Sequence, residues 1–178
     1  VLGLVRYMPG KPIEETAREI GMAPEEIVKL ASNENTLGPS PKALEAMNNA
    51  LLNSHIYPDG AAFDLVNAIA TKLNVPWDQV VVGTGSSEVI ELLCHSLLNP
   101  ETEMIVSQYS FSMYKVMATL FGARFTEVPA KNYGHDLDAM LAAVTEDTRL
   151  LFITNPNNPT GTMLGGDEID RFMSKVPD

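Results

Sequence analysis

A glycine-rich turn, GTGSSE at residues 83–88, lies between a short apolar run and a helix-like segment. The first backbone N–H groups of a helix have no partner inside the helix, and preceding glycines allow a ligand to approach them closely. The N–H groups of Ser86 and Ser87 therefore offer a site for an anion such as phosphate. The alternative is an ordinary strand-to-helix turn capped by a serine. Because Glu88 replaces the third glycine and no Gly-Lys-Ser/Thr follows, the turn is neither a dinucleotide fingerprint nor a P-loop.

An aromatic segment, YSFSMY at residues 109–114, follows the apolar run MIVS. At the end of a buried strand, its rings could stack on a planar ligand. Phe111 and Tyr114 are also three residues apart, a spacing typical of side chains that pack against a core from one helix face. The sequence leaves both interpretations open.

An amide-rich segment, NPNNPTG at residues 155–161, follows the run LLFIT. Its prolines and asparagines cannot extend a strand. An Asn–Pro bond is also a candidate for the cis form, which would fix a side-chain amide at the edge of a sheet. The alternative is a plain turn. The density of amides makes this segment the most specific chemical signal in the chain.

These three segments belong to an alternation of short apolar runs and helical stretches that begins after residue 74. Short apolar strands alternating with helices are typical of an α/β fold with a mostly parallel sheet flanked by helices. Ligands of such sheets bind beyond the carboxyl ends of the strands, where all three segments lie. We expect strands at 80–82, 104–106, 124–128 and 150–154, and helices at 86–98, 113–121, 137–144 and 167–174.

The preceding part of the chain contains helical patterns joined by turns. We expect helices at 12–22, 40–53 and 62–73, with a loop over 30–41. A tyrosine-containing turn, YPDG at 57–60, separates the last two helices.

Composition restricts the class of protein. The chain has 178 residues, 45% of them hydrophobic, which suffices for a folded domain with a core. A formal net charge of −11 argues against a nucleic-acid partner. No apolar run is long enough to cross a bilayer, and the first residues lack the pattern of a secretory signal, so we expect a cytoplasmic protein without a membrane partner. The lone cysteine and the scattered histidines argue against a disulfide and a metal site.

In their order and spacing, these segments resemble the fold type I pyridoxal-phosphate-dependent aminotransferases, and among them the histidinol-phosphate aminotransferase branch. The resemblance covers nearly the whole chain and includes YMPGKP at 7–12, LASNEN at 30–35 and YPDG at 57–60. It implies that residues 1–32 form an N-terminal arm. Residues 33–178 would be the first part of the large domain, which binds the cofactor pyridoxal 5'-phosphate.

The resemblance assigns four residues of the three chemical segments to the cofactor. The N–H groups of Ser86 and Ser87 would hold the phosphate, and Phe111 would stack on the pyridine ring. The side-chain amide of Asn158 would donate to the phenolic oxygen of the cofactor and so favour its ionised form.

Three further residues match functional positions of the family. Tyr57 would reach across the interface of a homodimer to the cofactor phosphate of the other subunit, whereas the alternative is a partly buried turn aromatic. Tyr7 and Asn35 would line the pocket of the substrate, an amino acid or a phosphorylated imidazole compound. For Tyr7 the alternative is a residue of a loose arm.

A pyridoxal enzyme also needs a lysine for the Schiff base and for proton transfer, and an acid against the pyridine nitrogen. In the family these groups, with the arginine that binds the substrate carboxylate, correspond to positions beyond Asp178. None of the lysines of this chain matches the catalytic one. We therefore expect this chain to be the amino-terminal part of a longer enzyme, with no catalytic residue of its own and no ability to transaminate alone.

The resemblance thus implies an aminotransferase of histidine biosynthesis that interconverts histidinol phosphate and 2-oxoglutarate with imidazole acetol phosphate and glutamate. Within the same fold, the alternatives are an aromatic amino acid aminotransferase and a related pyridoxal-phosphate-dependent decarboxylase. From another class, the alternative is a non-catalytic α/β module that binds a phosphorylated ligand.

Overall fold

The computed structural model describes residues 10–177, and Tyr7 lies outside this range. The described chain divides into two compact units, residues 10–80 and residues 81–177. Among the described residues, no helix is long and apolar enough to cross a membrane.

Residues 10–80 are helical, as the sequence predicts, and the expected helices are confirmed to within a few residues. α1 ends at Gly21, whose φ of 70° suits a left-handed helix end. Pro41 takes the first position of α2, where its missing N–H is not needed. The elements are α1 (Ile13–Ile20), the 3-10 turn η1 (Pro24–Glu26), α2 (Pro41–Leu51), α3 (Phe63–Leu73) and the 3-10 turn η2 (Trp77–Gln79).

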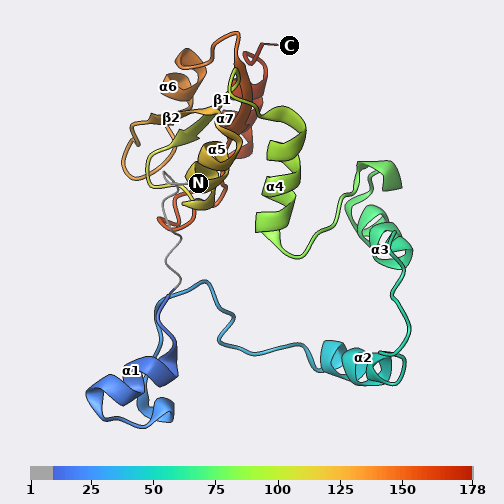
Figure 1. Cartoon of the computed structure of the whole chain (residues 1–178). Helices are drawn as coiled ribbons and strands as arrows, with labels where there is room; N and C mark the ends of the chain where they lie inside the picture. Colours follow the sequence, from blue (N-terminus) through green and yellow to red (C-terminus); the bar gives the residue numbers. More distant parts are fainter. Residues whose placement is uncertain (1–9, 178) are drawn as a thin grey trace. The chain divides into compact units, whose positions relative to one another are not determined.

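Residues 81–177 alternate between helices and strands. The three strands form a parallel sheet in the order β2-β1-β3, with helices packed on it (Figure 1). The predicted parallel sheet flanked by helices is confirmed. The elements are α4 (Ser86–Leu97), β1 (Glu103–Ser107), α5 (Met113–Phe121), β2 (Arg124–Val128), α6 (Leu137–Ala142), β3 (Thr148–Phe152) and α7 (Gly166–Met173).

The strand predicted at residues 80–82 is wrong. This segment is irregular, and the side chain of Val81 is 70% exposed. A strand exists only where a neighbouring strand completes its backbone hydrogen bonds. β1 already has a neighbour on each side, and within the described residues neither β2 nor β3 pairs with residues 80–82. The apolar run therefore has the composition of a buried strand but no strand beside it.

The core lies on both faces of β1, which is buried along its whole length. Because successive strand residues face opposite sides, Met104 and Val106 share one face and Ile105 takes the other. Met104 and Val106 pack in a cluster with residues of α4 and α5. Ile105 packs with Val128 of β2 and Met140 of α6. Each face of the central strand thus has its own helical cover.

A buried carboxylate joins the three strands at their amino ends. Glu103 of β1, only 5% exposed, accepts hydrogen bonds from the hydroxyls of Thr126 on β2 (2.6 Å), Thr148 on β3 (2.7 Å) and Thr145 (2.8 Å). Burial alone raises the pKa of Glu103. The three hydroxyl donors and the charge of Arg124 outweigh burial, so this pKa lies below its ordinary value. The ionised carboxylate is therefore a cross-strand anchor.

We expect Glu103→Ala to destabilise residues 81–177 by about 3 kcal/mol, because three threonine hydroxyls lose a charged acceptor. The matched control is Glu127→Ala, at an exposed position of β2, which should change the free energy of unfolding by less than about 0.5 kcal/mol. Urea unfolding followed by circular dichroism measures both. Equal effects of the two substitutions would contradict the anchor role of Glu103.

The same carboxylate should make stability depend on pH. Because its pKa is lower in the folded than in the unfolded chain, Glu103 stabilises the fold above its ordinary pKa of 4.5. This contribution should disappear as the pH falls through the lower, folded value. The difference in urea midpoint between neutral and acidic solution should therefore be smaller for Glu103→Gln than for the wild type. An unchanged difference would show that other carboxylates carry the dependence.

Candidate functional site

The glycine-rich turn opens directly into α4. Gly85 precedes the helix with a φ of 91°, a conformation that glycine adopts without strain, and Ser86 is the first helical residue. Among the described residues, no acceptor binds the N–H groups of Ser86, Ser87 or Glu88. Ser86 is exposed and Ser87 is half-buried. The turn therefore presents a row of free donors at the positive end of the helix dipole, as an anion site requires.

Glu88 stabilises this turn through hydrogen bonds to Thr84. Its carboxylate accepts hydrogen bonds from the backbone N–H and the hydroxyl of Thr84. The backbone bond, followed by the hydroxyl bond, lowers the pKa of Glu88. A Cβ added to Gly83 would lie 2.8 Å from the carboxylate oxygen of Glu88, so a larger residue there would displace this carboxylate. From the sequence, Glu88 served only to exclude a dinucleotide fingerprint, and its role in the turn was missed. The one signal for that role is its position, an acid four residues after Thr84.

The aromatic segment after β1 combines a core residue with a more accessible one. Tyr114 is buried, stacks on Phe152 with ring centroids 4.3 Å apart, and shares a hydrogen bond with the hydroxyl of Thr154 (2.9 Å). For Tyr114 the core interpretation is thus confirmed. Phe111 is partly buried, packs against the cluster of α4 and α5, and meets the edge of the Tyr114 ring at 5.9 Å. Its stacking on a planar ligand stays a prediction.

The amide-rich segment after β3 is organised by Asn157, a residue that the sequence analysis did not single out. Asn157 is only 4% exposed. Its side-chain N–H groups donate to the carbonyl oxygen of Tyr109 (3.2 Å) and to the hydroxyl of Thr160 (2.7 Å). The first of these bonds joins the loop after β3 to the loop after β1. The predicted cis Asn–Pro bond is also confirmed, since both Asn155–Pro156 and Asn158–Pro159 are cis.

Asn158, the predicted cofactor residue, differs from its neighbour. It is exposed, and no partner of its side-chain amide is found among the described residues. Its donors are therefore free for a ligand, whereas those of Asn157 are already used. A sequence pattern cannot distinguish these two adjacent asparagines, because their difference arises from the turn geometry.

The remaining predicted residues are Tyr57, Asn35 and Tyr7. Tyr57, 98% exposed, and Asn35 belong to residues 10–80, which form the other unit. The Asn35 side chain closes its own turn, since it donates to the carbonyl oxygen of Gly38 and accepts from the N–H of Leu37, both at 3.1 Å. Tyr7 lies outside the described residues. The roles of these three residues stay predictions.

The chain is similar to aminotransferases of known sequence and structure. The family described as aminotransferase class I and II matches residues 25–177. A histidinol-phosphate aminotransferase from Akkermansia muciniphila is 63% identical over 179 aligned residues, which cover 100% of this chain and 49% of the relative. Histidinol-phosphate aminotransferase 2 from Nitrosospira multiformis is 51% identical, with coverage of 96% and 43%. The chain thus spans about half the length of the curated relatives it matches.

Solved structures share the fold. The structure of histidinol-phosphate aminotransferase from Sinorhizobium meliloti in complex with pyridoxal-5'-phosphate has a TM-score of 0.82 and 24% identity, over 96% of this chain and 46% of that one. A putative histidinol-phosphate aminotransferase from Erwinia carotovora has a TM-score of 0.75 and 29% identity, over 81% and 43%.

The two neighbouring asparagines should respond differently to substitution. We expect Asn157→Ala to destabilise residues 81–177 by about 2 kcal/mol, because a buried side chain loses two hydrogen bonds. Asn158→Ala, the matched control in the same loop, should change stability by less than about 0.5 kcal/mol. Thermal and urea unfolding of both variants measure this difference. A reversed order would mean that Asn158 holds the loop and Asn157 is the free amide.

Proposed function

Because the chain belongs to the class I and II aminotransferase family, we propose that the protein carrying it is a pyridoxal-phosphate-dependent histidinol-phosphate aminotransferase of histidine biosynthesis. It would interconvert histidinol phosphate and 2-oxoglutarate with imidazole acetol phosphate and glutamate. The names of curated relatives up to 63% identical along the whole chain support this substrate pair. The structural observation that carries the proposal is the row of free N–H groups at the start of α4.

The residues present fit pyridoxal 5'-phosphate. A phosphate dianion needs N–H donors without other acceptors, and those of Ser86 and Ser87 meet that requirement. A flat aromatic ring needs an apolar surface, which Phe111 offers from its partly buried position. A phenolic oxygen needs a donor, and the amide of Asn158 is free.

When bound, the cofactor supplies an electron sink that stabilises negative charge on the substrate carbon that loses its proton. The residues of this chain bind and orient the cofactor. The Ser86 and Ser87 N–H groups fix the phosphate, Phe111 fixes the plane of the ring, and Asn158 donates to the phenolic oxygen and keeps it ionised. Glu88 acts indirectly, since its bonds to Thr84 maintain the turn that exposes the donors.

Further parts of the proposal concern the rest of the protein. The Schiff-base lysine, the acid at the ring nitrogen and the carboxylate-binding arginine are proposed for residues that follow Asp178. Residues 1–32 are proposed as an arm and residues 33–178 as the first part of the large domain. Tyr57 would act across the interface of a homodimer, Tyr7 and Asn35 would line the substrate pocket, and the protein would work in the cytoplasm.

An amino-transfer assay on the longer protein that contains this chain tests the proposal. With glutamate as donor, imidazole acetol phosphate should be consumed much faster than phenylpyruvate. A preference for phenylpyruvate would instead favour an aromatic amino acid aminotransferase, and release of carbon dioxide would favour a decarboxylase. Binding of a phosphorylated ligand without turnover would favour the non-catalytic module.

Removal of one backbone donor should weaken cofactor binding to this chain. Ser86→Pro deletes the N–H at the first helical position, where proline leaves the helix intact. We expect the dissociation constant of 4-deoxypyridoxine 5'-phosphate, an analogue without the aldehyde that reacts with lysines, to rise about tenfold, the value of one hydrogen bond to a charged group. Equilibrium dialysis measures it.

Ser86→Ala is the control, because it removes only the hydroxyl and keeps the N–H group. Its dissociation constant should stay within about threefold of the wild-type value. If Ser86→Ala weakened binding more than Ser86→Pro, the hydroxyl rather than the backbone would be the phosphate ligand.

A further inference from the structure

A network of hydrogen bonds is centred on Thr154, at the start of the loop formed by residues 155–161. Thr154 follows β3 and comes directly before residues 155–161. Its carbonyl oxygen accepts a hydrogen bond from Nε2 of His135 (2.9 Å), and its hydroxyl shares one with the hydroxyl of Tyr114 (2.9 Å). Both the backbone and the side chain of Thr154 are therefore held, each by a different segment of the chain.

Tyr114 connects this network to Phe111. The Tyr114 ring lies nearly parallel to Phe152, at an angle of 18°, and meets the Phe111 ring edge-on, at 86°. The rings of Phe152, Tyr114 and Phe111 thus form a continuous contact from β3 to the aromatic loop. The position of Thr154 therefore influences the position of the Phe111 ring, because Tyr114 contacts both residues. It also influences the position of Asn158, which follows Thr154 in the same loop.

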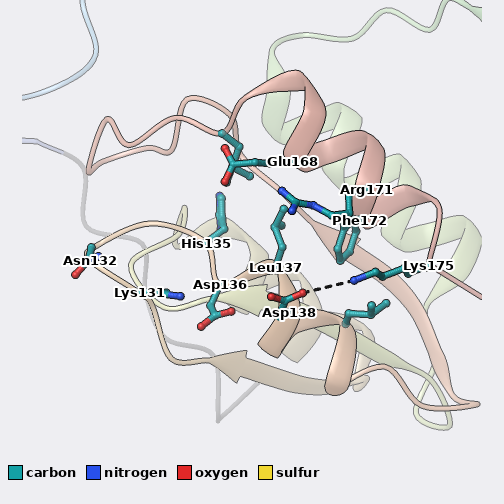
Figure 2. Close-up of a pocket in the computed structure, with 12 residues that line it drawn as sticks. Lys131, Asn132, His135, Asp136, Leu137, Asp138, Glu168, Arg171, Phe172 and Lys175 are labelled. Atoms are coloured by element: carbon teal, nitrogen blue, oxygen red, sulfur yellow. Dashed lines mark ion pairs between the residues drawn. The ribbon is translucent and has the colours of Figure 1, made fainter.

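His135 holds the other side of Thr154 from the segment before α6. A carbonyl oxygen can only accept, so Nε2 of His135 carries the hydrogen of this bond. The residue is 8% exposed, and its Nδ1 is buried without a partner among the described residues. Figure 2 shows the ring beside a cavity of about 360 Å³, whose lining includes Glu168 and Arg171 of α7. Within the described residues, the bond to Thr154 is therefore the only hydrogen bond that holds the ring.

We propose that His135 is a positioning residue of the candidate cofactor site: its hydrogen bond to the Thr154 carbonyl, together with the Thr154–Tyr114 hydroxyl pair, fixes the loop that carries Asn158 and the ring of Phe111. This inference rests on the proposed function for the identity of the ligand, but not for the contacts. An unpartnered buried nitrogen costs stability, and such costs persist where a neighbouring interaction is needed for function.

Hydrogen exchange on the whole chain tests the proposal. In His135→Leu, the amides of residues 155–162 and 109–114 should exchange about fivefold faster, the factor that corresponds to one lost hydrogen bond. Amides of α4 and β2 should keep their rates. His135→Gln places an N–H donor at a similar reach and should restore slow exchange.

Two more variants separate positioning from general destabilisation. Tyr114→Phe removes only the hydroxyl that contacts Thr154 and should accelerate exchange in the same two segments. His95→Leu alters an exposed histidine of α4 and should leave both segments unchanged. Uniform acceleration across residues 81–177 in His135→Leu, unchanged rates at residues 155–162, or failure of His135→Gln to restore them would overturn the proposal.

The dissociation constant of 4-deoxypyridoxine 5'-phosphate provides a second readout. It should rise about fivefold in His135→Leu and return to the wild-type value in His135→Gln. A wild-type chain that does not bind the analogue would count against the proposed function, and the exchange pattern alone would then decide whether His135 holds the loop. Binding that is equal in all three proteins would overturn the positioning role.

Discussion

The complete burial of β1 is the constraint on which residues 81–177 depend. A strand buried on both faces needs a cover on each, and α4 and α5 supply one while α6 supplies the other. The chain connects β1 to β2 through α5 and β2 to β3 through α6. Because each connection crosses over a face of the sheet, all three strands run parallel. The loops after β1 and β3 therefore start at one edge of the sheet, and the bond from Asn157 to Tyr109 joins them there.

The elements that the sequence predicted correctly are those whose signal is local. Periodic apolar residues, helix-terminal glycines and a proline at the start of α2 indicate the helices, and short runs that contain apolar or β-branched residues indicate β1, β2 and β3. The strand expected at residues 80–82 fails for a non-local reason. Pairing depends on whether another strand lies alongside, and composition cannot supply that information.

In the candidate site, too, the features with a local sequence signal were predicted and the others were not. The free donors of the Ser86 turn follow from a general property of helix starts, so the sequence was sufficient to predict them. The roles of Glu88 and Asn157 depend on which way a side chain turns, and the pattern alone did not single out either residue. Prediction was thus reliable for backbone groups at the ends of elements and unreliable for the side chains that hold the loops.

The two ends of the sheet differ in how completely their polar groups are paired. At the amino ends, the Glu103 carboxylate has three hydroxyl donors. At the other edge lie all three buried side chains with an unpartnered atom among the described residues: Ser107 at the end of β1, His135 and Asn157. Buried unpaired atoms are costly and normally rare. The buried polar groups of the sheet are therefore paired at the amino ends of the strands and incompletely paired near the carboxyl ends.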